Sequence, residues 1–424
     1  MLIMRIAWRS FLRHRRRSII TATAISFGLA LMLISFGIGN SAHNNMADMG
    51  IRLGAGHVIV QGKGFQAEQT LDYSVSEPDE ILAQARKISG VVTAVPRVTA
   101  GGLISTGAAS ARVMVAGVDP ALEPQASLIA APERRVVGEY LRRTEDMPYA
   151  SQPADIYVGV TLAETLALAV DDRVILTVSP RGDDRPRTAA FIVRGVFRTG
   201  IADLDNYSAQ IPIDVAQKLF HLGTDVTQIA VLCDGLDRTA GAVDALRARL
   251  RGRADFDQLE IMPWQEALRE LYEAIVLDDA GNYFMMAIIF VIVAIGIFNT
   301  VLMSVIERTR EFGVMMAIGT SARQMFAIVM AEAFVLGVVS VAVGLALGLS
   351  VHYYFASHGL DLTALYGEDL EMAGIVFEGR IYSDLAASSV TLWALVVLAI
   401  VVLSAIYPAL RATRLDPVEA MRHA

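Results

Sequence analysis

The sequence predicts an α-helical membrane protein with four transmembrane helices and a large extracytoplasmic α+β domain inserted between helices 1 and 2. Of the 424 residues, 54% are hydrophobic, which is too many for an ordinary soluble protein of this length. The excess is concentrated in four apolar runs, each with the roughly 20 residues that a helix needs to cross a ~30 Å hydrocarbon core. The four transmembrane helices are therefore expected at about residues 18–38, 283–306, 326–355 and 389–407.

The first apolar run has two interpretations, a retained anchor or a cleaved signal peptide. A basic segment with Arg13, Arg15, Arg16 and Arg17 precedes it, which suits both. Its apolar stretch of about 20 residues is longer than the ~7–15 residues of a signal-peptide core. We therefore expect residues 1–39 to form a cytoplasmic N-terminus and a retained first helix.

Residues 40–282 alternate strand-like and helix-like patterns, which predicts the α+β domain. Runs of β-branched residues between turn residues indicate strands at 57–61, 112–117, 173–178 and 190–196. A strand leading into a helix is expected over 156–168, and helices over 77–88, 237–250 and 263–275. Ser76 is the expected N-cap of the helix at 77–88, and Val243, Leu246 and Leu250 are the expected buried face of the helix at 237–250. The strand-rich stretch at about 120–212 suggests an inserted subdomain.

The helix expected at 263–275 runs directly into the second transmembrane helix. A helix that continues into a membrane span would transmit motion as a rigid lever. This lever is a hypothesis about how the outer domain and the membrane helices communicate.

Arginine placement predicts the orientation of the chain in the membrane. Six arginines precede the first apolar run, three lie between the second and third, and three follow the fourth. The loop at 356–388 has one arginine, Arg380, against six acidic residues. By the positive-inside rule, both termini, the segment at 307–325 and the tail at 408–424 are cytoplasmic, while 40–282 and 356–388 lie on the outer side of the membrane.

Several function classes are excluded by what the sequence lacks. The sequence has no GxxxxGK[ST] loop, since its Gly62-Lys63 pair is followed by Gly64 and not by Ser or Thr. A P-loop site for ATP on this chain is therefore excluded. No catalytic constellation and no metal-ligand spacing stand out, and the seven histidines are dispersed. The single cysteine, Cys233, cannot form an intrachain disulfide and is expected to be a buried thiol. The formal charge of −8 does not suggest a nucleic-acid partner.

The charged segment ERTREFGVMMAIG, residues 307–319, lies between the second and third apolar runs. On a helix, Glu307 and Arg310, and likewise Arg308 and Glu311, are i,i+3 pairs that can hold each other or bind a partner's charges. Within the spans, Glu332 and Asn299 are the notable polar residues, and a carboxyl group there is costly. Glu332 is expected either to snorkel or pair with Arg323, or to take part in coupling between helices.

This segment, followed by Ala317 to Ser321 and by Glu332-Ala333, resembles the signature of a permease family. The family comprises lipoprotein-releasing permeases, the macrolide-exporter type and the cell-division FtsX type of ABC transporter. The chain's ending, YPA at 407–409, Arg411, Arg414 and DPVEA at 416–420, resembles the family's C-terminal motif. In the outer region, residues 159–163, 193–197 and 262–264 resemble landmarks of the family's periplasmic domain. The resemblance thus extends over nearly the whole chain.

The resemblance implies that residues 307–325 form a cytoplasmic coupling helix that docks on a dimer of a separate ABC ATPase. That ATPase would bind ATP and Mg, and this chain would bind no cofactor itself. A second permease, either a copy of this chain or a paralogue, would complete the complex. The expected coupling residues are Glu307, Arg308, Arg310, Glu311, Phe312, Gly313, Ala317 and Gly319. The residues Val314-Met315-Met316 lack the arginines that the family places there, and the loop at 357–388 is longer and more acidic than in macrolide-exporter relatives.

Three functions follow as alternatives from the resemblance. The first is release of lipoproteins from the inner membrane to a periplasmic carrier, with cargo entering from membrane lipid between helices 1 and 2. The expected substrate-facing residues are Met32, Phe36, Met46, Met285, Met286 and Ile289. The second is macrolide-exporter-like efflux with a periplasmic adaptor. The third is an FtsX-like signalling scaffold, which is disfavoured because its outer domain is expected to be much smaller.

Overall fold

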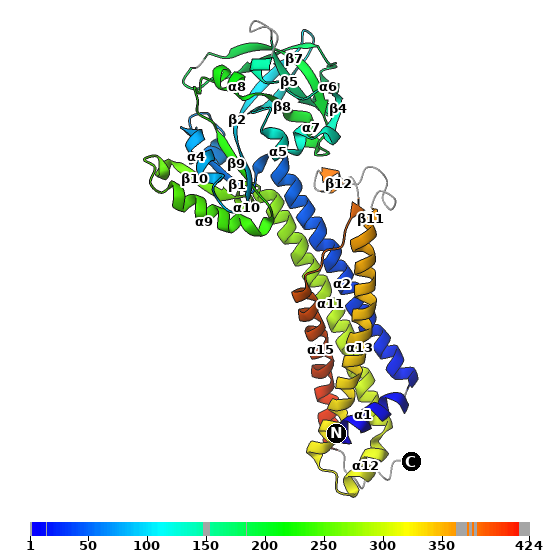
Figure 1. The fold of residues 1–424 in the computed structure, drawn as a ribbon. Coiled ribbons are helices and arrows are strands. Elements are labelled where there is room, and N and C mark those ends of the chain that lie inside the picture. The colour runs from blue at the N-terminus through cyan, green and yellow to red at the C-terminus, as the bar shows by residue number, and fades with distance from the viewer. Residues whose placement is uncertain are drawn as a thin grey trace. The chain divides into compact units, whose positions relative to one another are not determined.

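The computed structural model describes residues 2–13, 15–146, 153–183, 185–361, 371–372, 375–376 and 380–414 (Figure 1). The chain divides into two compact units. We call the first the membrane unit, which gathers the described residues of Met1–Asn44, Ile275–Asp361 and Arg380–Ala424. The second, the outer unit, gathers those of Asn45–Ala274 and Leu362–Gly379.

The membrane unit is built from four helices that are long and apolar enough to span a bilayer, which confirms the predicted fold class. These helices are α2 (Arg15–Gly50), α11 (Arg269–Glu307), α13 (Ala322–His358) and α15 (Ala387–Thr413). Two short helices, α1 (Leu2–Arg13) and α12 (Thr309–Ala317), lie at one end of this bundle (Figure 1). At the α13 end opposite α12, β11 (Leu360–Asp361) pairs with β14 (Arg380–Ile381).

Close packing between α2 and α13 depends on small residues. A Cβ atom on Gly344 would lie 2.9 Å from the carbonyl oxygen of Ser26, and one on Gly348 would lie 2.9 Å from Cδ1 of Leu33. The Ser26 hydroxyl donates a hydrogen bond of 2.8 Å to the carbonyl of Ser340. The glycines therefore let the two backbones approach, which is how membrane helices gain dispersion energy without a hydrophobic driving force.

The outer unit is organised around a 10-stranded mixed sheet with the order β10-β1-β9-β2-β3-β8-β5-β7-β4, while β6 pairs with β2 and β7. Most neighbouring strands are antiparallel, and β3–β8 and β5–β7 are parallel. The strands are β1 (Val58–Gly62), β2 (Val91–Ser105), β3 (Ser110–Val118), β4 (Arg135–Gly138), β5 (Ala154–Gly159), β6 (Arg173–Val178), β7 (Arg187–Phe197), β8 (Ser208–Pro212), β9 (Gln228–Cys233) and β10 (Leu259–Pro263). A separate pair is formed by β12 (Glu371–Met372) and β13 (Ile375–Val376).

Short helices pack their apolar sides against this sheet. On α9, Val243, Leu246 and Leu250 are buried, as the sequence predicts. The helices of the outer unit are α3 (Phe65–Glu68), α4 (Pro78–Ala85), α5 (Glu123–Ala126), α6 (Val160–Thr165), α7 (Ala202–Tyr207), α8 (Ile213–Leu219), α9 (Thr239–Leu250) and α10 (Trp264–Ala267). Single helical turns are η1 (Ile51–Ala55), η2 (Leu128–Ala130), η3 (Pro132–Arg134), η4 (Thr144–Asp146), η5 (Leu236–Arg238) and η6 (Phe256–Gln258).

Two local predictions in the outer unit are wrong. Ser76 is not the cap of α4, since the N-cap is Glu77 with φ of 48° and no side-chain cap bond, while the Ser76 carbonyl accepts from Arg253. The predicted helix at 263–275 is interrupted, because Pro263 ends β10 and Leu268 (φ −106°, ψ 52°) separates α10 from α11. A continuous lever can therefore begin only at Arg269.

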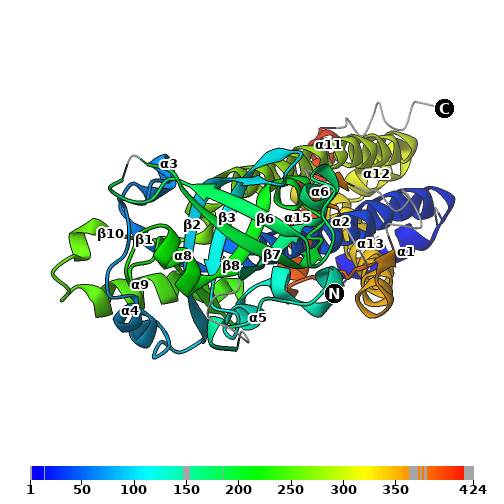
Figure 2. The same cartoon turned by 90° about the horizontal axis from the view of Figure 1, so that it is seen from above.

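The strand-rich stretch at about 120–212 shares the sheet with its flanks. Its strand β8 pairs with β3, and its strand β6 pairs with β2. Figure 2 shows β2, β3, β6, β7 and β8 side by side in one curved layer.

Where β1 begins and the neighbouring strand β9 ends, His57 and Cys233 form a buried polar contact. His57 is 4% exposed, and its Nδ1 atom accepts a 3.2 Å hydrogen bond from the backbone N–H of Cys233. Burial lowers the pKa of His57 from its usual 6.5, because a charged imidazolium would lose its hydration there. Burial likewise raises the pKa of the Cys233 thiol to about 11, so the thiol stays protonated and unreactive at neutral pH.

Candidate functional site

The charged segment folds as a short helix between two tight turns. Glu307 ends α11, and Arg308 leaves helical geometry with φ of −103° and ψ of 15° before α12 begins. After α12, Gly319 adopts φ of 104°, a left-handed conformation that a residue with a side chain would adopt only with strain. Ser321 and Gln324 then form a capping box that starts α13. Arg308 and Gly319 therefore bound α12 and make it a helix separate from α11 and α13.

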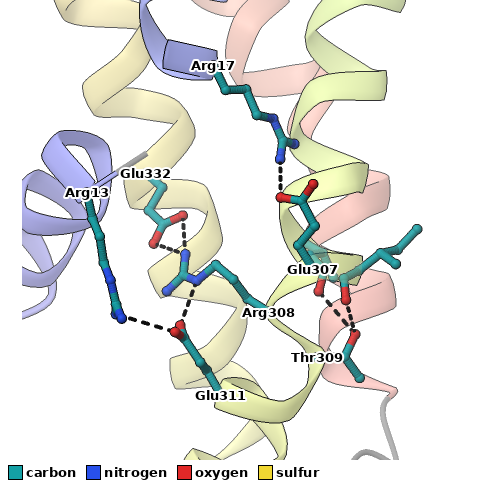
Figure 3. Close-up of polar contacts among 9 residues, drawn as sticks. Arg13, Arg17, Glu307, Arg308, Thr309, Glu311 and Glu332 are labelled. Carbon is teal, nitrogen blue, oxygen red and sulfur yellow. Dashed lines mark hydrogen bonds and ion pairs between the residues drawn. The ribbon is translucent and has the colours of Figure 1, made fainter. Parts of the chain in front are cut away.

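Arg308 is the centre of a buried ion-pair network (Figure 3). Its Nη1 donates to both carboxylate oxygens of Glu332, at 2.7 and 2.9 Å, and its Nε donates to Glu311 at 2.9 Å. The guanidinium also lies over the ring of Phe312, 4.9 Å from its centroid. Arg308 is 8% exposed and Phe312 is 1% exposed, so the network fixes one face of α12 against α13.

The environment of Arg308 holds its charge in place. Burial by itself would lower the pKa of the guanidinium, but the carboxylates of Glu332 and Glu311 outweigh it, and the pKa lies above its usual value. A small cavity of about 60 Å³ lies beside the network and is lined in part by Arg17, Ser304 and Glu332.

The predicted Arg308–Glu311 pair is confirmed, whereas pairing of Glu332 with Arg323 is wrong. Glu332 lies nine positions after Arg323 on α13, and nine steps of about 100° place the two side chains on opposite faces of a helix. Arg323 is exposed in the first turn of α13, while Glu332 faces α12 and Arg308.

Two N-terminal arginines pair with acidic residues of this segment, and one of them, Arg13, joins the network. Arg17 donates to Glu307 at 2.9 Å, and Arg13 donates to Glu311 at 3.3 Å (Figure 3). The predicted Glu307–Arg310 pair is wrong, because Arg308 interrupts the helix between them. Glu307 binds Arg17 instead, and Arg310 is exposed with no ion pair among the residues that the structure describes. From the sequence alone, Arg13 and Arg17 indicate only the membrane orientation and the basic flank of the first apolar run. Arg13 and Arg17 carry the opposite charge to Glu307 and Glu311, and all four residues are predicted at the same end of the membrane helices. That combination was the signal from which the two pairs could have been predicted.

The other face of α12 is open. Arg310, Val314 and Ala317 are exposed at helical spacing, and Ile318, the residue that caps the helix, is 79% exposed. Gly313, by contrast, is buried beside Phe312. α12 therefore has one face fixed by ion pairs and an opposite face that presents aliphatic side chains. Val314 and Ile318 were not among the predicted coupling residues, although their i,i+4 spacing in an otherwise charged segment is a readable signal.

Three predicted substrate-facing residues lie in the interior of the membrane unit. Met32, Phe36 and Met286 are buried in one cluster, with Ile289 partly buried against it. The Phe36 ring stacks on Trp393 of α15, with centroids 5.0 Å apart. In the single chain these residues therefore bind α2, α11 and α15 together.

The remaining predicted residues lie elsewhere. Met285 and Asn299 are exposed on α11, and Asn299 makes no hydrogen bond within the described part of the chain. Asn299 and Glu332 are thus not brought together. Met46, on the part of α2 that belongs to the outer unit, is buried.

Comparison with known proteins finds two matching family models. Residues 18–249 match the MacB-like periplasmic core domain, and residues 283–417 match the FtsX-like permease C-terminal region. The lipoprotein-releasing system transmembrane protein LolC of Neisseria meningitidis is 23% identical over 83% of this chain and 83% of its own length. The macrolide export ATP-binding/permease protein MacB of Nitrobacter winogradskyi is 28% identical over 63% of this chain and 38% of its own length. A crystal structure of the periplasmic region of MacB from Actinobacillus actinomycetemcomitans matches 51% of this chain and 92% of its own, with 14% identity and a TM-score of 0.35.

Proposed function

Because this chain belongs to the family of ABC transporter permeases that joins a MacB-like periplasmic core domain to an FtsX-like permease region, we propose that α12 is its coupling helix. The observation that carries the proposal is the two-faced character of α12. One face is held by Arg308 and Phe312, and the other exposes Val314 and Ile318. A partner that covered an aliphatic side chain of this size would gain roughly 1.5–3 kcal/mol per residue.

In this proposal a dimer of a separate ATPase binds ATP and Mg and docks on the open face of α12. A push on α12 reaches α13 through Arg308–Glu332, and it reaches α2 through the end of α11, where Glu307 binds Arg17. Both α2 and α11 include residues of the outer unit, so each offers a covalent route for the movement. Two ATPase subunits require two permease units, either two copies of this chain or this chain and a paralogue.

The proposed orientation places α12 and both termini in the cytoplasm and the outer unit in the periplasm. The arginines of the N-terminal segment and of residues 308–323 support it, because cytoplasmic loops of inner-membrane proteins carry this excess.

We propose that the cargo is a lipoprotein, extracted from the inner membrane and passed to a periplasmic carrier. The LolC relative supports this proposal because the match covers 83% of both chains, whereas the MacB relative is matched over only 38% of its own length. The competing function is efflux through a periplasmic adaptor, which the MacB relative supports.

The test is a release assay with the chain and its cognate ATPase reconstituted together in liposomes. A lipidated protein and the same protein without its acyl chains are each offered, and transfer to a soluble acceptor is followed with and without ATP. ATP-dependent transfer of only the lipidated form supports the proposal. Efflux that requires an adaptor, with no transfer of the lipidated form, would show that the cargo assignment is wrong while leaving the coupling role of α12 open to its own test.

A further inference from the structure

The N-terminal helix α1 is a basic amphipathic helix on the outside of the bundle. Figures 1 and 2 both place it beside α13, and the two helices are in contact. Ala7 is fully buried against the bundle, whereas Met4 and Trp8, one turn apart, are each about half exposed. Arg5 and Arg9 follow them with the same i,i+4 spacing. Such a helix, with a large apolar residue and arginines on adjoining faces, is typical of an element that lies in a membrane interface.

An open groove lies between the outer side of α1 and the neighbouring side of α13. Its volume is about 690 Å³, and apolar atoms dominate its walls. On the α13 side, Phe334 and Val338 are one turn apart and are 41% and 43% exposed. The groove is lined by Met4, Arg5, Trp8, Arg9, Phe334, Val335, Val338 and Val339. Its shape thus combines an aliphatic and aromatic trough with two cations on one rim.

The acidic residues that the structure describes near the groove supply no counter-charge to these two cations. No acidic residue precedes Asp48 in the sequence, and Glu332 is the one acidic residue of α13. Glu332 is held by Arg308, and its position two residues before Phe334 places it on a different side of the helix. Arg5 and Arg9 make no ion pair among the residues that the structure describes.

We propose that this groove binds an anionic phospholipid of the leaflet at this end of the bundle. The phosphate would bind between Arg5 and Arg9, because a guanidinium presents paired donors that match phosphate oxygens. An acyl chain would lie along Trp8, Phe334 and Val338. The groove therefore offers positive charge to the lipid headgroup and an apolar surface to the acyl chain.

The bound lipid would also fix α1 in its place. The far end of α1 carries Arg13, which binds Glu311 of the network that positions α12. A lipid at Arg5 and Arg9 would thus hold one end of the helix whose other end supports α12. The proposal requires only that α1 lies at a membrane surface, and it is independent of the cargo.

The experiment measures lipid retention by the full chain. The protein is purified in a mild non-ionic detergent, titrated with dioleoyl phosphatidylglycerol or dioleoyl phosphatidylcholine, and examined by native mass spectrometry. Three proteins are compared with the unmodified chain. They are R5Q/R9Q, the charge-matched control R16Q/R323Q, whose arginines are exposed outside the groove, and V338W, which fills the trough and keeps every charge.

We expect the unmodified chain to retain phosphatidylglycerol in preference to phosphatidylcholine. Because an arginine near an anionic lipid surface contributes about five-fold in affinity, R5Q/R9Q should bind phosphatidylglycerol about 25-fold more weakly. R16Q/R323Q should bind it as the unmodified chain does, and V338W should lose it despite an unchanged charge.

Three results would overturn the proposal. Equal retention of the two lipids would exclude headgroup recognition. Equal weakening in R5Q/R9Q and R16Q/R323Q would indicate general attraction to a basic surface. Full retention by V338W would exclude the trough as the site, since its indole would occupy the space of the acyl chain. A thermal unfolding curve for each variant separates these results from loss of folding.

Discussion

Substitution of Glu332 by glutamine should destabilise the membrane unit much more than the same change at Glu311. Glu332 receives two short hydrogen bonds from Arg308, and the side chains of the pair are 18% and 10% exposed. Glu311 also binds Arg308, but its side chain is 45% exposed. The two substitutions remove the same charge from the same arginine and differ in burial.

The expected magnitude follows from that difference. Removal of one partner from a buried ion pair costs roughly 3–5 kcal/mol, because the remaining charge has lost its hydration and its counter-ion. Arg308 keeps Glu311 in E332Q, so we expect a loss at or just below the bottom of this range, about 2–3 kcal/mol. An exposed pair contributes about 0–1 kcal/mol, which is the loss expected for E311Q.

The assay is equilibrium unfolding of the full chain in a lipid bilayer or bicelle, with the free energy of unfolding as the readout. A third variant, R308M/E332L, replaces the pair with apolar residues. It should recover most of the stability lost in E332Q, because no uncompensated charge remains.

A loss in E332Q no larger than that in E311Q would refute the argument that burial makes the Arg308–Glu332 pair important. A double variant that is as unstable as E332Q would show instead that the pair contributes direct attraction that an apolar contact cannot replace.

Three further predictions address coupling, packing and pH. I318D should reduce binding of the ATPase by at least about ten-fold while changing stability by less than about 0.5 kcal/mol, because this exposed side chain has little to lose on folding; co-purification and unfolding measure the two effects. G344L should destabilise the chain by about 1–3 kcal/mol through overlap with α2, whereas G296L, which has nothing within 4 Å of its Cβ position, should be nearly neutral in unfolding experiments. The pKa of His57 in the folded chain lies below the usual 6.5. At a pH between the folded and the unfolded pKa, the unfolded chain therefore binds more protons, so the free energy of unfolding should fall as the pH drops below about 6.5. H57N should flatten that pH dependence, measured by unfolding at pH 5 to 8, and H221N, at an exposed position, should leave it unchanged.

Each of these predictions has a distinct contrary result. Normal ATPase binding by I318D would place the docking surface elsewhere on the chain. Equal effects of the two glycine substitutions would mean that side-chain volume between α2 and α13 is not limiting. An unchanged pH slope in H57N would assign the pH dependence to other groups of the outer unit.

The four long apolar helices could be predicted from the sequence because they depend on a local quantity. Apolar length is a property of short segments, and the four helices follow from it. The strands at 173–178 and the buried face of α9 were also predictable, because periodicity within one element decides them.

The site was only partly predictable. The i,i+3 rule gave the Arg308–Glu311 pair, since both residues lie within one turn. It could not give Glu332 as the main partner of Arg308, because the two are 24 residues apart and meet only when α12 folds back on α13. The predicted cap of α4 was wrong for a related reason, since the Ser76 carbonyl accepts a hydrogen bond from Arg253, which lies far along the chain.

The sequence by itself thus determined which segments enter the membrane, which family the chain resembles and where a charged helix interrupts the apolar spans. Only the tertiary structure decided which charges of that helix are used internally and which side chains remain open. The physical reason is that an ion pair depends on distance and burial in three dimensions, whereas hydrophobic length is already present in the linear chain. Tertiary folding brings Arg13 to Glu311 and Glu332 to Arg308, where these charges hold α12 in place, and it pairs Arg17 with Glu307 at the end of α11.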